Sequence, residues 1–107
     1  MEEILKVFCE IQLQRIEDNK RDRGPIASVQ PAMAVRMLKD AVAKLESHVS
    51  AMNAVQFSPP MLRAENAAVQ QALGNAIAWQ AADCANWCMI IAKASGGLED
   101  ARRDIAV

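Results

Sequence analysis

The sequence predicts an all-α protein, and three observations carry this prediction. Hydrophobic residues make up 52% of the 107 residues, but aromatic residues only 4%, and tyrosine is absent, a composition that suits packed helices better than β-sheets. Apolar residues recur at spacings of three and four along three long stretches, the period of an amphipathic helix. Prolines and glycines gather between these stretches, where they interrupt helices. We expect one domain, residues 1–107, with three main helices and a short C-terminal helix.

The charge of the chain disfavours several classes of partner without excluding them. The formal net charge is −1, and the sequence contains no long basic run, so neither nucleic acid nor a membrane surface is an expected partner. No apolar run is long enough to span a membrane, and acidic residues at the start of the chain do not match a secretory signal. We expect a cytoplasmic protein.

The first expected helix runs from Glu2 to about Asn19. Ile4, Phe8 and Ile11 fall on one face of it because they are separated by three or four residues. Leu5, Cys9 and Ile16 join this face.

A connector is expected from Lys20 to Gln30, since this segment combines a charged run with Gly-Pro. It contains Arg21 and Arg23. From such a loop the two guanidinium groups could reach a phosphate, or they could remain solvated in a turn.

The second expected helix begins at Pro31, which suits the first helical position, and continues to about Met52. A loop should follow as far as Pro60. The apolar seam of this helix comprises Ala34, Leu38, Ala41, Val42, Leu45, Val49 and Met52.

The stretch from Met61 to Ser95 is predicted as one long helix or as two pieces that meet near Gly74. Gly96 and Gly97 should end it. The final segment, Leu98 to Val107, is expected to form a short helix with solvent-facing charges.

The second half of this long stretch should be buried and should carry the functional site. Its apolar stripe comprises Ile77, Ala78, Ala81, Ala82, Cys84, Ala85, Cys88, Met89 and Ile91. A second flank holds Trp79, Gln80, Asp83, Asn86, Trp87 and Ile90. A carboxylate in such a helix needs a cation, a metal or a ligand beside it, because burying an unpaired charge is costly.

Cys9, Cys84 and Cys88 are expected to be reduced core residues. A zinc site would need more soft ligands than the sequence offers, since His48 is the one histidine.

Residues 80–92, QAADCANWCMIIA, resemble the last core helix of the phage MazG-like proteins of the all-α NTP pyrophosphatase superfamily, which typically reads E-x-x-D-V-A-N-F-x-M-M-I-A. Residues 38–46, LKDAVAKLE, fall where this family typically reads L-x-E-E-V-A-E-L-E. The resemblance implies a helical bundle and a Mg²⁺ site built from two acidic pairs. The corresponding positions here are Ala41, Lys44, Gln80 and Asp83. One aspartate cannot hold a catalytic Mg²⁺, so we expect no cofactor.

These replacements suggest a metal-free pocket that binds a nucleotide. We expect Lys44 to take the place of the metal and to pair with Asp83, beside a ligand phosphate. Amide side chains would hydrogen-bond a base or ribose, and a tryptophan would stack on the base. The alternative is a simple Lys44–Asp83 ion pair with both tryptophans in the core or at a subunit contact. The expected ligand-binding residues are Arg21, Arg23, Lys44, His48, Trp79, Gln80, Asp83, Asn86 and Trp87.

The expected function is therefore non-catalytic sequestration of a nucleotide or, if the gene is viral, of a nucleotide-derived signal of host defence, in the host cytoplasm. The chain should form homo-oligomers, dimers or tetramers, because two of its helices are apolar on more than one flank. One alternative is an active Mg²⁺-dependent nucleoside triphosphate pyrophosphohydrolase that uses Glu46 or Glu65 with Asp83. Another is a protein-interaction module that inhibits a host defence complex.

Overall fold

The computed structural model describes the backbone of residues 1–23, 29–56 and 63–106, and the side chains of residues 1–20, 29–56 and 66–105. In these ranges the chain forms helices and no strand. The helices are α1 (Glu2–Arg23), α2 (Pro31–Gln56), α3 (Arg63–Ala94) and α4 (Leu98–Ala106). The prediction of an all-α chain with three main helices and a short C-terminal helix is confirmed.

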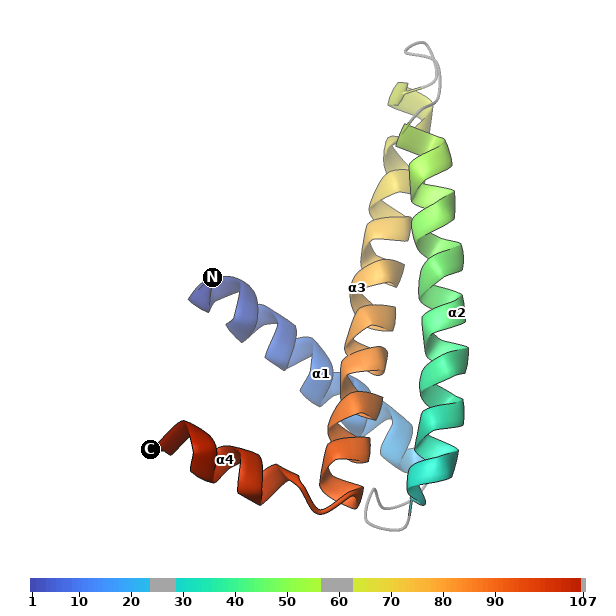
Figure 1. The fold of residues 1–107 in the computed structure, drawn as a ribbon. Helices are drawn as coiled ribbons and strands as arrows, with labels where there is room; N and C mark the ends of the chain where they lie inside the picture. Colours follow the sequence, from blue (N-terminus) through green and yellow to red (C-terminus); the bar gives the residue numbers. More distant parts are fainter. Residues whose placement is uncertain (24–28, 57–62, 107) are drawn as a thin grey trace.

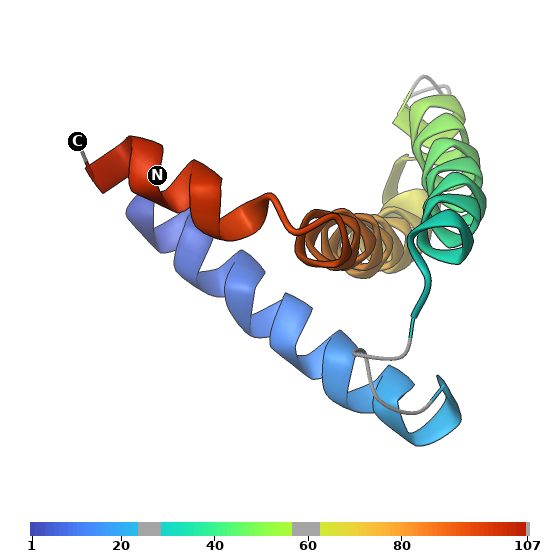
Figure 2. The same cartoon turned by 60° about the horizontal axis from the view of Figure 1, so that its bottom comes forward.

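The α2 and α3 helices form a long antiparallel hairpin, and α1 crosses α3 near the end of the hairpin where α2 begins (Figure 1). The N-terminal half of α1 and the whole of α4 extend away from the hairpin on the same side (Figures 1 and 2). The molecule measures 54 × 33 × 21 Å. Its elongated shape follows from the hairpin and from the two helices that project from it.

Two helix ends differ from the prediction. The α1 helix continues to Arg23 instead of ending near Asn19, because lysine and arginine in the charged run are good helix formers. Arg21 and Arg23 therefore belong to the last turn of α1 and not to a loop, and their side chains lie outside the described residues. The α2 helix runs to Gln56, so the first part of the predicted loop is helical, and the rest lies outside the described residues.

Other helix ends agree with the prediction. Pro31 is the first residue of α2, and the Ala34 N–H donates to the Gln30 carbonyl at 3.0 Å, as expected for proline in a first turn. The α3 helix is continuous through Gly74, which decides between the two predicted alternatives. Gly96 ends α3 with a φ of 80°, and its N–H donates to the Lys93 carbonyl at 3.1 Å, which is a glycine C-cap.

The core lies between α2 and α3, and it is small. Its buried hydrophobic residues are Ala34, Ala41, Ala82, Trp87 and Ile90. The predicted apolar stripe of α3 was partly wrong, since Cys88 and Met89 are exposed while Trp87 and Ile90, from the polar flank, are buried. The buried face of α3 thus includes the flank that contains Asp83, because polar side chains of α1 form hydrogen bonds with the polar residues of that flank.

Many large apolar side chains remain exposed. On α1 these are Ile4, Leu5, Val7 and Leu13, and on α2 they include Val42 and Val49, two residues that the predicted seam had placed inward. None of the helices in the described ranges combines the length and the apolar character needed to cross a bilayer.

Candidate functional site

The centre of the candidate site is an ion pair between Arg15 of α1 and Asp83 of α3. The Arg15 Nε donates to Asp83 Oδ1 at 2.8 Å, and Nη2 donates to Oδ2 at 2.7 Å. The guanidinium therefore grips both carboxylate oxygens, the strongest geometry available to this pair. The Asp83 side chain is only 11% exposed and that of Arg15 is 31% exposed. The predicted partner of Asp83, Lys44, is replaced by Arg15.

Further contacts hold Arg15 in place. Its guanidinium carbon lies 5.7 Å from the centre of the Trp79 ring, within the range of a cation–π interaction. The hydrogen bonds with Asp83 raise the pKa of Arg15 above its ordinary value, against an opposing effect of burial. Arg15 is thus a cation held in place by its ion pair with Asp83. The same guanidinium lies over the ring of Trp79.

One helical turn away, Gln12 and Asn86 form a second bridge between α1 and α3. The Asn86 Nδ2 donates to the backbone carbonyl oxygen of Gln12 at 3.0 Å, and the Gln12 side-chain Nε2 donates to Asn86 Oδ1 at 3.2 Å. Asn86 is buried, and an amide in that position needs partners. Its hydrogen-bonding capacity is used for helix packing, in contrast to its predicted role in binding a base.

A polar pocket opens beside the ion pair, where α1, α2 and α3 meet. Its volume is about 140 Å³. The lining residues are Arg15 and Asn19 of α1, Met37, Asp40, Ala41 and Lys44 of α2, and Gln80, Asp83 and Trp87 of α3. Ligand pockets for molecules of drug size are about 300–1,000 Å³. This pocket is smaller, and it has room for a group of about the size of a phosphate.

The charges in this pocket come from two acids and two bases. Arg15 and Asp83 neutralise each other, whereas Lys44 and Asp40 form no salt bridge with any described residue. Asp40 and Lys44 both come from α2, four residues apart, and both belong to the lining. Lys44 is exposed, so its ammonium group is accessible to an anion.

These carboxylates do not form a site that suits Mg²⁺. Both oxygens of Asp83 are bound by Arg15, and Glu46 of α2 does not line the pocket. Nowhere in the described part of the chain do three or more His, Cys, Asp or Glu side chains come together as metal ligands would. A hard divalent cation needs several free oxygens, which this donor set lacks. The side chain of Glu65 lies outside the described residues.

The structure gathers some of the predicted site residues and separates others. Lys44, Gln80, Asp83 and Trp87 line the pocket, whereas His48, Trp79 and Asn86 are not part of its described lining. His48 is half-buried further along α2. The four residues in the lining come from two helices, and their convergence follows from the pairing of α2 with α3.

Sequence reasoning missed Arg15, Asn19 and Asp40. A signal for Arg15 was present, because it follows Ile11 by four residues and so continues the face of α1 that begins with Ile4 and Phe8. A polar residue that prolongs an apolar helical face is a candidate partner for a buried polar group on the facing helix.

Three comparisons with known proteins found no matching family model, no matching curated protein and no matching solved structure.

Proposed function

We propose that this protein binds a nucleotide or a nucleotide-derived molecule in the pocket between α1, α2 and α3, and that it sequesters the ligand without cleaving it. One observation carries the proposal. Ala41, Lys44, Gln80 and Asp83, the four positions that the MazG-like resemblance assigns to metal-binding acids, all line this one pocket. Three of them are no longer acidic, so the ancestral metal site would persist as a pocket with different chemistry.

The chemistry of the pocket supports an anionic ligand. Lys44 offers an ammonium group that forms no salt bridge with a described acid, although Asp40 lines the same pocket, and Gln80 offers an amide that donates and accepts hydrogen bonds. Arg15 cancels the charge of Asp83, which lowers the repulsion that an anion would otherwise meet. A pocket of about 140 Å³ would hold a phosphate group, while the rest of the ligand would lie along the surface.

The test is to incubate the purified chain with a panel of nucleotides, cyclic nucleotides and ADP-ribose derivatives, with Mg²⁺ or with EDTA. The protein is then separated and denatured, and the released molecules are identified by mass spectrometry. Lys44→Glu is the informative variant, and Lys39→Glu is its control, since Lys39 lies on the same helix outside the pocket lining. We expect intact ligand in EDTA from the wild type and from Lys39→Glu, with retention by Lys44→Glu reduced at least about tenfold, or about 1.4 kcal/mol.

Two other outcomes would overturn the proposal. Cleaved products that require Mg²⁺ would establish the pyrophosphohydrolase alternative, with Asp40 and Asp83 as the first residues to replace. The absence of any retained ligand in both conditions would favour the third candidate, a protein-interaction module that inhibits a host complex.

A further inference from the structure

We propose that the N-terminal half of α1 is a homodimer interface, in which the apolar face formed by Ile4, Val7, Phe8 and Ile11 packs against the same face of a second copy of the chain. The argument rests on surface area, on the position of this face and on its chemistry. It does not depend on the ligand proposed above.

The isolated chain exposes too much surface for a protein of its size. Its solvent-accessible surface is 8022 Å², whereas a compact monomer of 11.7 kDa exposes about 5,900 Å². Its radius of gyration is 17.1 Å, compared with about 13 Å for a compact domain of about 100 residues. Two copies together carry a surplus of about 4,200 Å², which falls in the range of about 2,000–5,000 Å² that obligate homodimers bury.

Two helices, α1 and α4, project from the hairpin and add to the exposed surface. The N-terminal half of α1 lies clear of α2, and α4 makes no extensive contact with any other helix in the described ranges. A 22-residue helix such as α1 gains most of its stability from packing of its apolar face. In the single chain the second half of α1 is held on α3 by the hydrogen bonds of Gln12 and Arg15, whereas on the apolar face Phe8 and Ile11 are half-buried and Ile4 and Val7 remain exposed.

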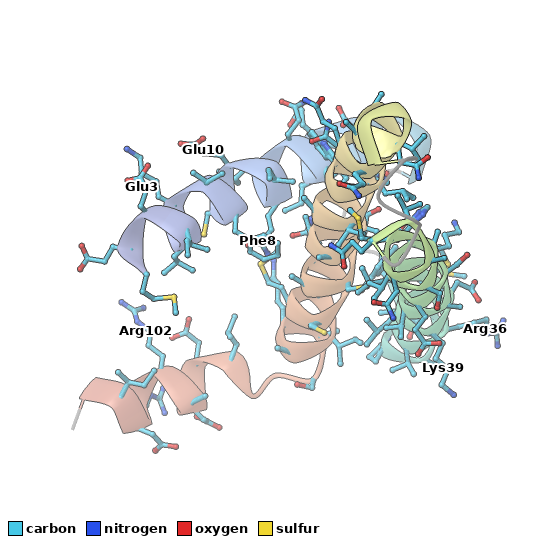
Figure 3. All side chains as sticks on the ribbon, turned by 90° about the horizontal axis from the view of Figure 1, so that it is seen from above. Glu3, Phe8, Glu10, Arg36, Lys39 and Arg102 are labelled. Atoms are coloured by element: carbon cyan, nitrogen blue, oxygen red, sulfur yellow. The ribbon has the colours of Figure 1, made fainter. Side chains whose placement is uncertain are left out.

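The exposed part of α1 forms an open apolar groove. The groove has a volume of about 320 Å³, and its lining is apolar at Ile4, Val7, Phe8 and Ile11 with Glu3 at its edge. Figure 3 shows Phe8 on the side of α1 that faces α3, while Glu10 points to the opposite side. Ile4 is 68% exposed and Val7 is 46% exposed. A face with this pattern is that of an amphipathic helix without its partner.

A second copy is the occupant that these observations favour. The surplus area matches a homodimer, and a two-fold axis allows one helical face to be buried against itself without any complementary surface elsewhere. The competing surface is a narrow stripe on the outer side of α2, where Val35, Val42 and Val49 recur every seven residues. That stripe belongs to a helix that is already packed along its length on α3. The stability of α2 therefore depends less on a further partner than the stability of the N-terminal half of α1 does.

The test compares two matched substitutions in the full chain, Val7→Glu and Val49→Glu. Val7 and Val49 are exposed to nearly the same extent, 46% and 48%, so the two variants differ in the helix that receives the charge. Sedimentation velocity over a range of protein concentrations gives the dimer dissociation constant, and circular dichroism gives the helix content. We expect the wild type and Val49→Glu to form dimers with the same dissociation constant. For Val7→Glu we expect a dissociation constant at least tenfold higher, a loss of about 1.4 kcal/mol in dimer affinity.

Because a monomeric Val7→Glu chain can also lose its fold, a second measurement uses the wild type. In a mixed dimer of isotope-labelled and unlabelled chains, filtered nuclear Overhauser spectra should show contacts between copies from the methyl groups of Ile4, Val7 and Ile11. Contacts confined to Val42, Val49 or any other face would overturn the proposal. A wild type that is folded and monomeric at all concentrations would also overturn it, and would point to a different protein as the occupant of the groove.

Discussion

Arg15 and Asp83 lie 68 residues apart in the sequence, yet they form the most direct link between α1 and α3, with two hydrogen bonds of 2.8 and 2.7 Å. The pair is placed at the crossing of the two helices, between the apolar half of α1 and the polar pocket. It therefore has two effects. It fixes α1 on the hairpin, and it binds both oxygens of Asp83, the one carboxylate among the described side chains of α3 that lines the pocket.

Breaking this pair should destabilise the protein. Arg15→Met leaves the Asp83 carboxylate with little solvent and no cation, and we expect a loss of about 2–3 kcal/mol in the free energy of unfolding. This is less than the about 3–5 kcal/mol of fully buried pairs, because Arg15 is 31% exposed and water screens the interaction. The double variant Arg15→Met with Asp83→Leu should recover most of the loss, since it removes the unpaired charge. Urea denaturation at one fixed protein concentration measures all three.

The control for that experiment is Arg103→Met. Arg103 pairs with Asp100 on α4, but both side chains are 79% exposed, and such surface pairs contribute little. We expect no measurable change in stability. A loss as large as that of Arg15→Met would show that the methionine substitution itself, and not the unpaired Asp83 carboxylate, is responsible.

Asn86→Ala should cost about 1–3 kcal/mol of unfolding free energy, because it removes both hydrogen bonds to Gln12 and leaves the part-buried Gln12 Nε2 without its acceptor. Gln14→Ala is the matched control, since the Gln14 amide bonds only to Asp18 at an exposed position of α1. Thermal unfolding followed by circular dichroism distinguishes the two. Equal effects would argue against the bridge between α1 and α3.

Two glycine substitutions should have opposite effects. At Gly74, inside α3, an added Cβ would come 3.8 Å from Met52 Cε, an ordinary contact, so Gly74→Ala should stabilise the helix by about 0.5–1 kcal/mol. At Gly96 an added Cβ meets nothing within 4 Å, but φ is +80°, and Gly96→Ala should cost about 1 kcal/mol. Chemical denaturation measures both, and a destabilising Gly74→Ala would mean that α3 is not a regular helix at that point.

The three free cysteines should differ in reactivity. Burial, helped by the neighbouring Cys88 and Asp83, raises the pKa of the Cys84 thiol, and the thiolate is the reactive form. We expect iodoacetamide to label Cys84 more slowly than the exposed Cys9 and Cys88, as measured by peptide mapping. Because a raised pKa shifts ionisation to higher pH, half-maximal labelling of Cys84 should occur at a higher pH in the folded protein than in urea. Equal rates in the folded state would contradict the prediction.

The helices were predictable because their signals are local. Pro31 starts α2 and Gly96 ends α3 through conformational preferences of single residues, and the spacing of apolar residues is a property of a few turns. The end of α1 was misjudged because a charged run is equally compatible with a helix and a loop. The continuity of α3 through Gly74 could not be read from a local pattern, because a glycine lowers helix propensity without excluding a helix, and α3 is packed along α2.

The candidate site was predictable only in part. Lys44, Gln80 and Asp83 were placed at one site from the sequence, and all three line the pocket. The partner of Asp83 was predicted wrongly, because a nearby lysine on α2 and a distant arginine on α1 are equally able to neutralise a carboxylate. Asn86 and Trp79 looked available for a ligand, but α1 uses both for its own packing.

Local patterns in the sequence were enough to predict four helices, the small core residues that let α2 and α3 approach, and the positions from which a pocket could be built. Which flank of α3 is buried, and which cation meets Asp83, depended on how the helices pack together. The reason is that periodicity and helix-end preferences act within a few residues, whereas the choice between Arg15 and Lys44 depends on the angle and register at which α1 crosses α3. Many long-range contacts set that geometry together, and no segment of the sequence carries it alone.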